Sequence, residues 1–210
     1  MIRPLITSLV MLILSCWGAE ATAQSVDWQA APVYTSIESA QAARAAGQPV
    51  YRIDLTKKRL RSLPTELTEW TELREIVLDR NKLTRIDEDL SSWAFLERFS
   101  AVSNALEAFP ASAMAWTGLK ELDLGDNAID SIPLDIDQLS GLHTLSLWSN
   151  IIAHYPASLG DLRKLKTLDL EYNGLGAKGG AALADALRTN ATLTTLDLWG
   201  NDLGAEGGAA

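Results

Sequence analysis

The sequence predicts an α/β solenoid, in which short coils stack and each coil adds one strand to a concave parallel sheet. The first observation is a series of five asparagines spaced 23 residues apart, with a sixth after a further 28 residues. The second is that apolar residues keep fixed places around each asparagine, as Leu145 and Leu147 do before Asn150. A fixed period of about 20 to 50 residues indicates stacked repeats rather than one globular core.

The strand of each coil should lie just before its asparagine. Leu145 and Leu147 alternate with Ser146 and Trp148, and this period of two predicts a short strand with one buried face. One period before the first asparagine the apolar residues recur, but Lys58 occupies the asparagine position, so this coil is a degenerate first repeat. We expect seven parallel strands, centred near Ile53, Ile76, Phe99, Leu122, Leu145, Leu168 and Leu196.

Each asparagine falls where the chain turns out of the strand. Its carboxamide carries two N–H donors and an acceptor oxygen, so it can bond backbone groups of its own coil and of the adjacent coil. Lys58 has no acceptor atom, so the first coil should lack this bond. We expect a structural ladder along the solenoid, formed by Asn81, Asn104, Asn127, Asn150, Asn173 and Asn201.

The second half of each coil should form the convex side. Apolar residues recur there at every third or fourth position, often followed by proline, as at Pro64 and Pro110. This pattern predicts extended segments or short helical turns in the early repeats. Trp70, Trp93 and Trp116 are 23 residues apart and should stack in the core.

The last full coil is longer than the others. Its residues 179–188 have the composition and pattern of an amphipathic helix. The following repeat begins at Asn201 and is incomplete, so we expect either a fragment of a longer protein or a partner that covers the open end. Residues after Gly204 should then be poorly packed.

The repeated pattern L-x-x-L-x-L-x-x-N-x-L resembles the leucine-rich repeat over residues 50–210. The longer coil around residues 173–201 is similar to ribonuclease-inhibitor-like repeats, whose convex side is a full helix. The resemblance implies a leucine-rich-repeat domain over residues 50–210, with a concave parallel sheet, short convex turns and a helix in the last full repeat.

The N-terminal residues predict export. Residues 1–23 have a positive start, an apolar stretch and a small-x-small cleavage site that ends at Ala23, as signal peptides do. The alternative is a bacterial lipobox that ends at Cys16, the only cysteine, which would then be lipidated. In neither case can an internal disulfide form, and this favours a bacterial envelope protein, either secreted or periplasmic, or anchored as a lipoprotein. We expect residues 24–49 to form a tether and an N-terminal capping helix, with Thr35 and Glu38 at capping-box spacing.

The sequence offers little for catalysis or cofactor binding. The net charge of −9 argues against nucleic acid. His143 and His154 lie on different faces of one coil, so we expect no metal site. Residues 174–179 match G-x-G-x-x-G, a dinucleotide-binding pattern, but glycines recur in the next repeat and therefore belong to a shared turn. We expect neither an enzyme nor a cofactor.

The outward positions of the strands remain as the candidate site. Acidic residues dominate these positions. Trp148 and Trp199 are unusual among them, because an exposed indole on a sheet contributes little to the stability of the fold. Aromatic anchors among polar neighbours are typical of protein interfaces. We therefore expect a non-enzymatic scaffold that binds a protein or peptide on this concave face, whose acidic residues favour a basic ligand. The alternative is a cell-envelope lipoprotein that binds glycan. The candidate ligand-binding residues are Trp148, Trp199, Asp169, Glu171, Asp123, Glu121 and Asp197.

Overall fold

The computed structural model describes residues 27–209, and the chain divides after Ala30 into two units. The first unit is described only at its end, where η1 (Trp28–Ala30) forms a single 3-10 turn. The signal peptide predicted at residues 1–23 and the candidate lipidation site Cys16 lie outside the described residues. Among residues 27–209, no helix is both long enough and apolar enough to span a bilayer.

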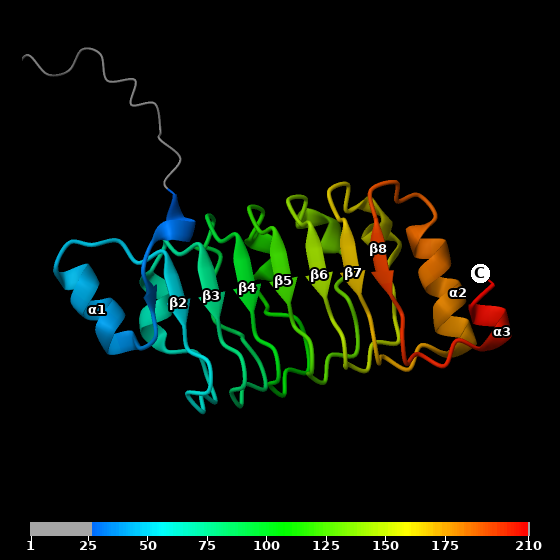
Figure 1. Cartoon of the computed structure of the whole chain (residues 1–210), viewed down its shortest axis with the longest axis horizontal. Coiled ribbons are helices and arrows are strands. Elements are labelled where there is room, and N and C mark those ends of the chain that lie inside the picture. Colours follow the sequence, from blue (N-terminus) through cyan, green and yellow to red (C-terminus); the bar gives the residue numbers. More distant parts are fainter. Residues whose placement is uncertain (1–26, 210) are drawn as a thin grey trace, which may run out of the picture. The chain divides into compact units, whose positions relative to one another are not determined.

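The second unit is a solenoid built on one parallel sheet of eight strands, which pair in chain order (Figure 1). The predicted solenoid with a parallel sheet is confirmed, and the register between the 23-residue coils advances by one period, as in the pairing of Ile76 with Phe99. The strands are β1 (Val33–Tyr34), β2 (Arg52–Asp54), β3 (Glu75–Val77), β4 (Arg98–Ser100), β5 (Glu121–Asp123), β6 (Thr144–Ser146), β7 (Thr167–Asp169) and β8 (Thr195–Asp197).

Strand β1 was not predicted, since residues 24–49 were expected to form only a tether and a capping helix. Val33 pairs with Arg52 and Tyr34 pairs with Ile53, so this short segment forms an edge of the sheet. Two residues are too few to show an alternating pattern, and β1 lies 19 residues before its partner rather than 23. Neither strand periodicity nor repeat spacing could therefore reveal it.

The convex side consists of 3-10 turns in four coils and of α-helices towards the C-terminus, as predicted. Trp93 and Trp116 are fully buried behind the sheet with ring centroids 5.6 Å apart, and each indole N–H donates to a carbonyl of the preceding coil. These bonds satisfy the polar atom of a buried indole. The elements are η2 (Thr65–Glu69), η3 (Ala113–Ala115), η4 (Ile136–Gln138), η5 (Ala157–Asp161), α2 (Gly176–Leu187) and α3 (Gly204–Gly207).

Helix α1 (Ile37–Ala45) lies beside the first coil, near strand β1 (Figure 1). Its N-cap is Ser36, whose hydroxyl oxygen accepts from the Ser39 amide at 3.2 Å, so the expected cap at Thr35 was wrong by one residue. Ala40 is completely buried, and Arg44 forms an ion pair with Glu72 of the first coil. These contacts attach the helix to the solenoid.

The six asparagines form the ladder's hydrogen bonds. Asn150 is representative, because its Nδ2 donates to the carbonyl of Leu147 in its own coil and to that of Leu124 in the preceding coil, both at 3.0 Å. Its Oδ1 accepts from the Ile129 amide at 2.9 Å. Each side chain therefore joins two coils through backbone groups that the turn leaves unpaired. Equivalent bonds are made by Asn81, Asn104, Asn127, Asn173 and Asn201.

The C-terminal residues differ from the expectation of poor packing. Helix α3 lies against α2, where an added Cβ at Gly180 would come within 3.0 Å of the Gly207 carbonyl oxygen. An added Cβ at Gly207 would come within 2.8 Å of Ala177. Glycine at both places therefore allows the two backbones to approach closely. The adjacent strand β8 remains an edge strand, and Leu196 is 41% exposed.

Candidate functional site

The N-terminal half of the concave face carries paired charges. The residue at the start of each strand alternates in sign, from Arg52 through Glu75 and Arg98 to Glu121. Glu75 is bonded to Arg52 at 2.5 Å and lies 3.7 Å from Arg98, which also lies 3.5 Å from Glu121. Glu121, one of the predicted ligand-binding residues, lies in this row, and Arg98 compensates its charge.

The C-terminal half carries a group of unpaired carboxylates. One oxygen from each of Asp169, Glu171 and Asp197 lies within 4.8 Å of the other two. Among the described residues, none of the three forms an ion pair with a lysine or arginine. Partial desolvation raises the pKa of Glu171, and the nearby charges of Asp197 and Asp169 raise it further. The sequence placed these three residues in adjacent coils, and the fold brings their carboxylates together.

Two exposed aromatic residues, Tyr172 and Trp199, lie close in the sequence to these carboxylates, one in each of two adjacent coils. Trp199 is 63% exposed, and Tyr172 is 48% exposed. Their ring centroids are 4.7 Å apart in an edge-to-face arrangement, which is a favoured geometry for aromatic pairs. We call the five residues Asp169, Glu171, Tyr172, Asp197 and Trp199 the aromatic–acidic patch.

Tyr172 was not identified from the sequence. It occupies the turn position just before the ladder asparagine, with φ of 54°, where other coils carry residues such as Arg80 and Ser149. Because this turn position lies outside the strand, a search restricted to strand residues could not find it. The sequence nevertheless distinguishes Tyr172, since it is an aromatic residue at a turn position where the other coils carry other residue types.

Trp148 has a structural contact that the sequence did not reveal. Its indole occupies the space above Gly125 in the preceding coil, where an added Cβ would lie only 2.0 Å from Nε1. Trp148 is therefore only half-exposed and packs on the sheet towards β5. Trp199, in contrast, packs against Tyr172 of the preceding coil.

Asp123 lies in β5 on the same face and is half-buried. Its Oδ1 accepts from the Gly125 amide at 3.1 Å. Desolvation raises the pKa of this carboxyl above its ordinary value, and the charges of Asp79 and Asp169 raise it further. Its partial burial leaves less of the carboxylate accessible to a ligand than an exposed side chain would offer.

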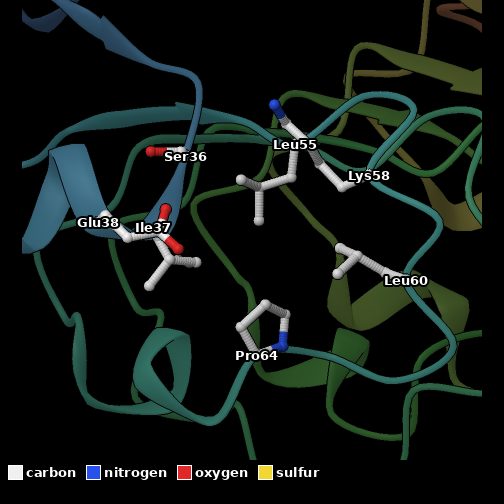
Figure 2. Close-up of a pocket in the computed structure, with 7 residues that line it drawn as sticks. All are labelled: Ser36, Ile37, Glu38, Leu55, Lys58, Leu60 and Pro64. Atoms are coloured by element: carbon white, nitrogen blue, oxygen red, sulfur yellow. The ribbon is translucent and has the colours of Figure 1, made fainter.

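A pocket of about 160 Å³ lies at the first coil, where the ladder position is occupied by Lys58. Figure 2 shows Ser36, Ile37 and Glu38 on one side of this pocket and Leu60 and Pro64 on the other. The pocket is lined by the N-cap and first residues of α1 and by the segment that follows β2, whereas the aromatic–acidic patch lies in the coils of β7 and β8.

The glycines of the G-x-G-x-x-G pattern have roles in the turn and in helix packing. Gly174 and Gly176 have φ of 66° and 59°, values that favour glycine, and α2 begins at Gly176. An added Cβ at Gly179 would lie 3.0 Å from the Leu175 side chain. The pattern is thus explained by the chain's own geometry.

Comparisons with known proteins agree with this architecture. Residues 117–175 and 189–210 match two leucine-rich-repeat families. No curated protein sequence is significantly similar to the chain. Among solved structures, the chain is similar to a leucine-rich-repeat protein of Leptospira interrogans, with 25% identity and a TM-score of 0.62 over 80% of this chain and 47% of that one.

Two further structures have the same fold. An internalin from Listeria monocytogenes is 21% identical with a TM-score of 0.57, over 76% of this chain and 50% of that one. The plant peptide hormone receptor RGFR1, in complex with RGF2, is 25% identical with a TM-score of 0.59, over 72% of this chain and 24% of that one. The chain spans about half the length of the two bacterial proteins.

The continuous parallel sheet, the convex turns and the matched repeats define the class, an α/β leucine-rich-repeat solenoid. The chain therefore has the leucine-rich-repeat fold, and residues 117–175 and 189–210 match its repeats. Its distinguishing features are the paired charges over β2–β5 and the aromatic–acidic patch in the coils of β7 and β8.

Proposed function

We propose that this protein is an exported, non-enzymatic scaffold that binds a basic protein or peptide segment through the aromatic–acidic patch. The observation that carries the proposal is the exposed Trp199–Tyr172 pair beside three carboxylates that lack ion-pair partners among the described residues. The fold supports binding in general, because the similar plant receptor is a peptide hormone receptor.

The chemistry of the patch suits a lysine or arginine side chain. A cation over an aromatic ring is attracted by the ring's electrons, and adjacent carboxylates accept its hydrogen bonds. Exposed aromatic rings also supply apolar contact area with few torsions to immobilise. Earlier strands offer less to a basic ligand, because Arg52 and Arg98 already compensate the acidic groups there.

The test uses two labelled peptides that differ only in one central residue, lysine or glutamate, between two leucines. The wild-type protein should prefer the lysine peptide. Trp199→Ala should weaken binding at every ionic strength, by roughly 2 kcal/mol for an anchor residue. Asp197→Asn should weaken it mainly at low ionic strength, because salt screens exposed charges. Fluorescence anisotropy titrations measure both effects.

Matched controls come from elsewhere on the solenoid. Leu134→Ala removes a side chain that is 84% exposed on the convex side, and Glu121→Gln removes a carboxylate paired with Arg98. Neither should reduce binding of the lysine peptide by more than about twofold, since isolated surface changes are usually small. Equal affinity for the lysine and glutamate peptides, or no effect of Trp199→Ala, would refute the proposal.

The exposed Trp199 and Tyr172 rings also favour a second candidate, which is glycan binding by a membrane-anchored lipoprotein. Aromatic rings can stack on sugar rings, and such binding depends little on salt. A glycan array would detect it, and binding that is lost in Trp199→Ala but retained in Asp197→Asn at all ionic strengths would support it over the peptide.

A further inference from the structure

The sheet has a second charged row, along the rim at the N-terminal ends of its strands. The residue that precedes each strand bonds to its counterpart in the next coil, as the Lys166 amide does to the His143 carbonyl and the Thr194 amide to the Lys166 carbonyl. In the early coils the charges of this row are compensated, because Glu97 lies 3.7 Å from Arg74 and 2.5 Å from Lys120.

The compensation stops at β7. Lys164 and Lys166 are exposed, and no carboxylate of residues 27–209 forms an ion pair with either ammonium group. Glu171 of the aromatic–acidic patch lies five residues after Lys166, two residues beyond the end of β7. Unpaired positive charge therefore precedes β7, and unpaired negative charge follows it.

We propose that the concave face selects an extended segment with charges of opposite sign, held along the direction of β7. The basic residue would lie at the aromatic–acidic patch and an acidic residue at Lys166. Five residues of extended chain span about 16 Å, so the two charges of the ligand should be five residues apart. This inference rests on the proposed function and adds the composition and orientation of the ligand.

The physical reason is that a uniformly basic segment would place one of its cations beside Lys166. Like charges repel, and juxtaposed like charges are a common means of rejecting wrong partners. A segment with one charge of each sign meets an opposite charge at both ends. With Lys166 at one end and the aromatic–acidic patch at the other, the face therefore favours a segment with one charge of each sign over a uniformly basic segment.

The experiment compares three labelled hexapeptides with the same four neutral central residues and with terminal pairs Lys–Glu, Lys–Lys and Glu–Glu. Both peptide termini are blocked, so the side chains carry the only charges. Wild-type protein should bind Lys–Glu more tightly than Lys–Lys by roughly threefold to tenfold at low ionic strength, and the difference should shrink as salt is added. Lys166→Glu should reverse the order, so that Lys–Lys binds more tightly.

The control variant is Lys178→Glu, which makes the same charge change at an exposed lysine of α2, and it should preserve the wild-type order. Circular dichroism checks that each variant is folded. Equal affinity for Lys–Glu and Lys–Lys, both above Glu–Glu, would overturn this inference and leave the proposed function intact. If neither exceeds Glu–Glu, both the inference and the proposed function fail.

Discussion

At the scale of single residues, Asp123 shows how the packing of the face affects its charge. Neighbouring packing desolvates the carboxylate, and Asp79 and Asp169 add like charges, so the pKa of Asp123 in the folded protein lies above its unfolded value. Such a group contributes stability that is fully present below the unfolded pKa and is lost as pH rises through the folded pKa. Raising the pH towards neutrality therefore reduces the stability that Asp123 contributes.

Asp123→Asn should consequently stabilise the protein at neutral pH, by about 1 kcal/mol or less, as expected for a change that keeps the hydrogen bond. The amide oxygen can still accept from the Gly125 amide. The gain should vanish as pH falls below about 4, where the wild-type carboxyl is protonated in both states. Urea denaturation across pH measures this, with exposed Asp137→Asn as the control. A gain that persists unchanged at low pH would contradict the electrostatic explanation.

At the scale of elements, the ladder explains why the first coil differs from the others. In later coils the asparagine Nδ2 donates to carbonyls two and three residues earlier, as Asn81 does to Asp79 and Leu78. Lys58 has no acceptor for the amides of an adjacent segment and lies at a pocket instead. Lys57 and Arg59 on either side of it both adopt positive φ, a conformation with a steric cost for side-chain-bearing residues.

Lys58→Asn should extend the ladder by one member. The new carboxamide can donate to the carbonyls of Leu55 and Thr56, and the expected gain is about 1 kcal/mol for the added hydrogen bonds. Thermal denaturation of Lys58→Asn and of Lys58→Ala separates this effect from the mere loss of lysine. Equal melting temperatures for the two variants would mean that the new asparagine does not form these hydrogen bonds.

The repeat pattern was sufficient to predict the strand centres, because a core position must recur wherever a coil adds to the same sheet. It did not predict contacts between non-consensus positions. Examples are the indole of Trp148 over Gly125 and the pairing of Trp199 with Tyr172. Each of these contacts depends on the particular side chains at neighbouring positions of two adjacent coils. The repeat consensus does not specify the residues at those positions. Ion pairs such as Arg98 with Glu121 were missed for the same reason, because they arise from the alternation of specific residues.

At the scale of the whole molecule, the solenoid separates two properties along its length. One continuous apolar core extends from α1 to α2, so stability is distributed over every coil. The Tyr172–Trp199 pair and the cluster of three carboxylates instead lie in the coils of β7 and β8. This separation of the core from the aromatic–acidic patch agrees with the proposed single binding surface. The cellular location of the protein then decides which ligands can reach that surface.

We expect the mature protein to be exported and to begin at Gln24, because residues 1–23 combine a charged start, an apolar stretch and small residues before the cleavage site. Mass spectrometry of the protein from a bacterial envelope fraction measures this directly. Cleavage after Ala23 gives a chain without cysteine, and Cys16→Ala should then change neither its mass nor its release in soluble form. The alternative outcome is a mature wild-type chain that begins at Cys16 and carries acyl groups, together with release of the Cys16→Ala variant from the membrane. This outcome would establish the lipoprotein and favour a ligand at the cell surface.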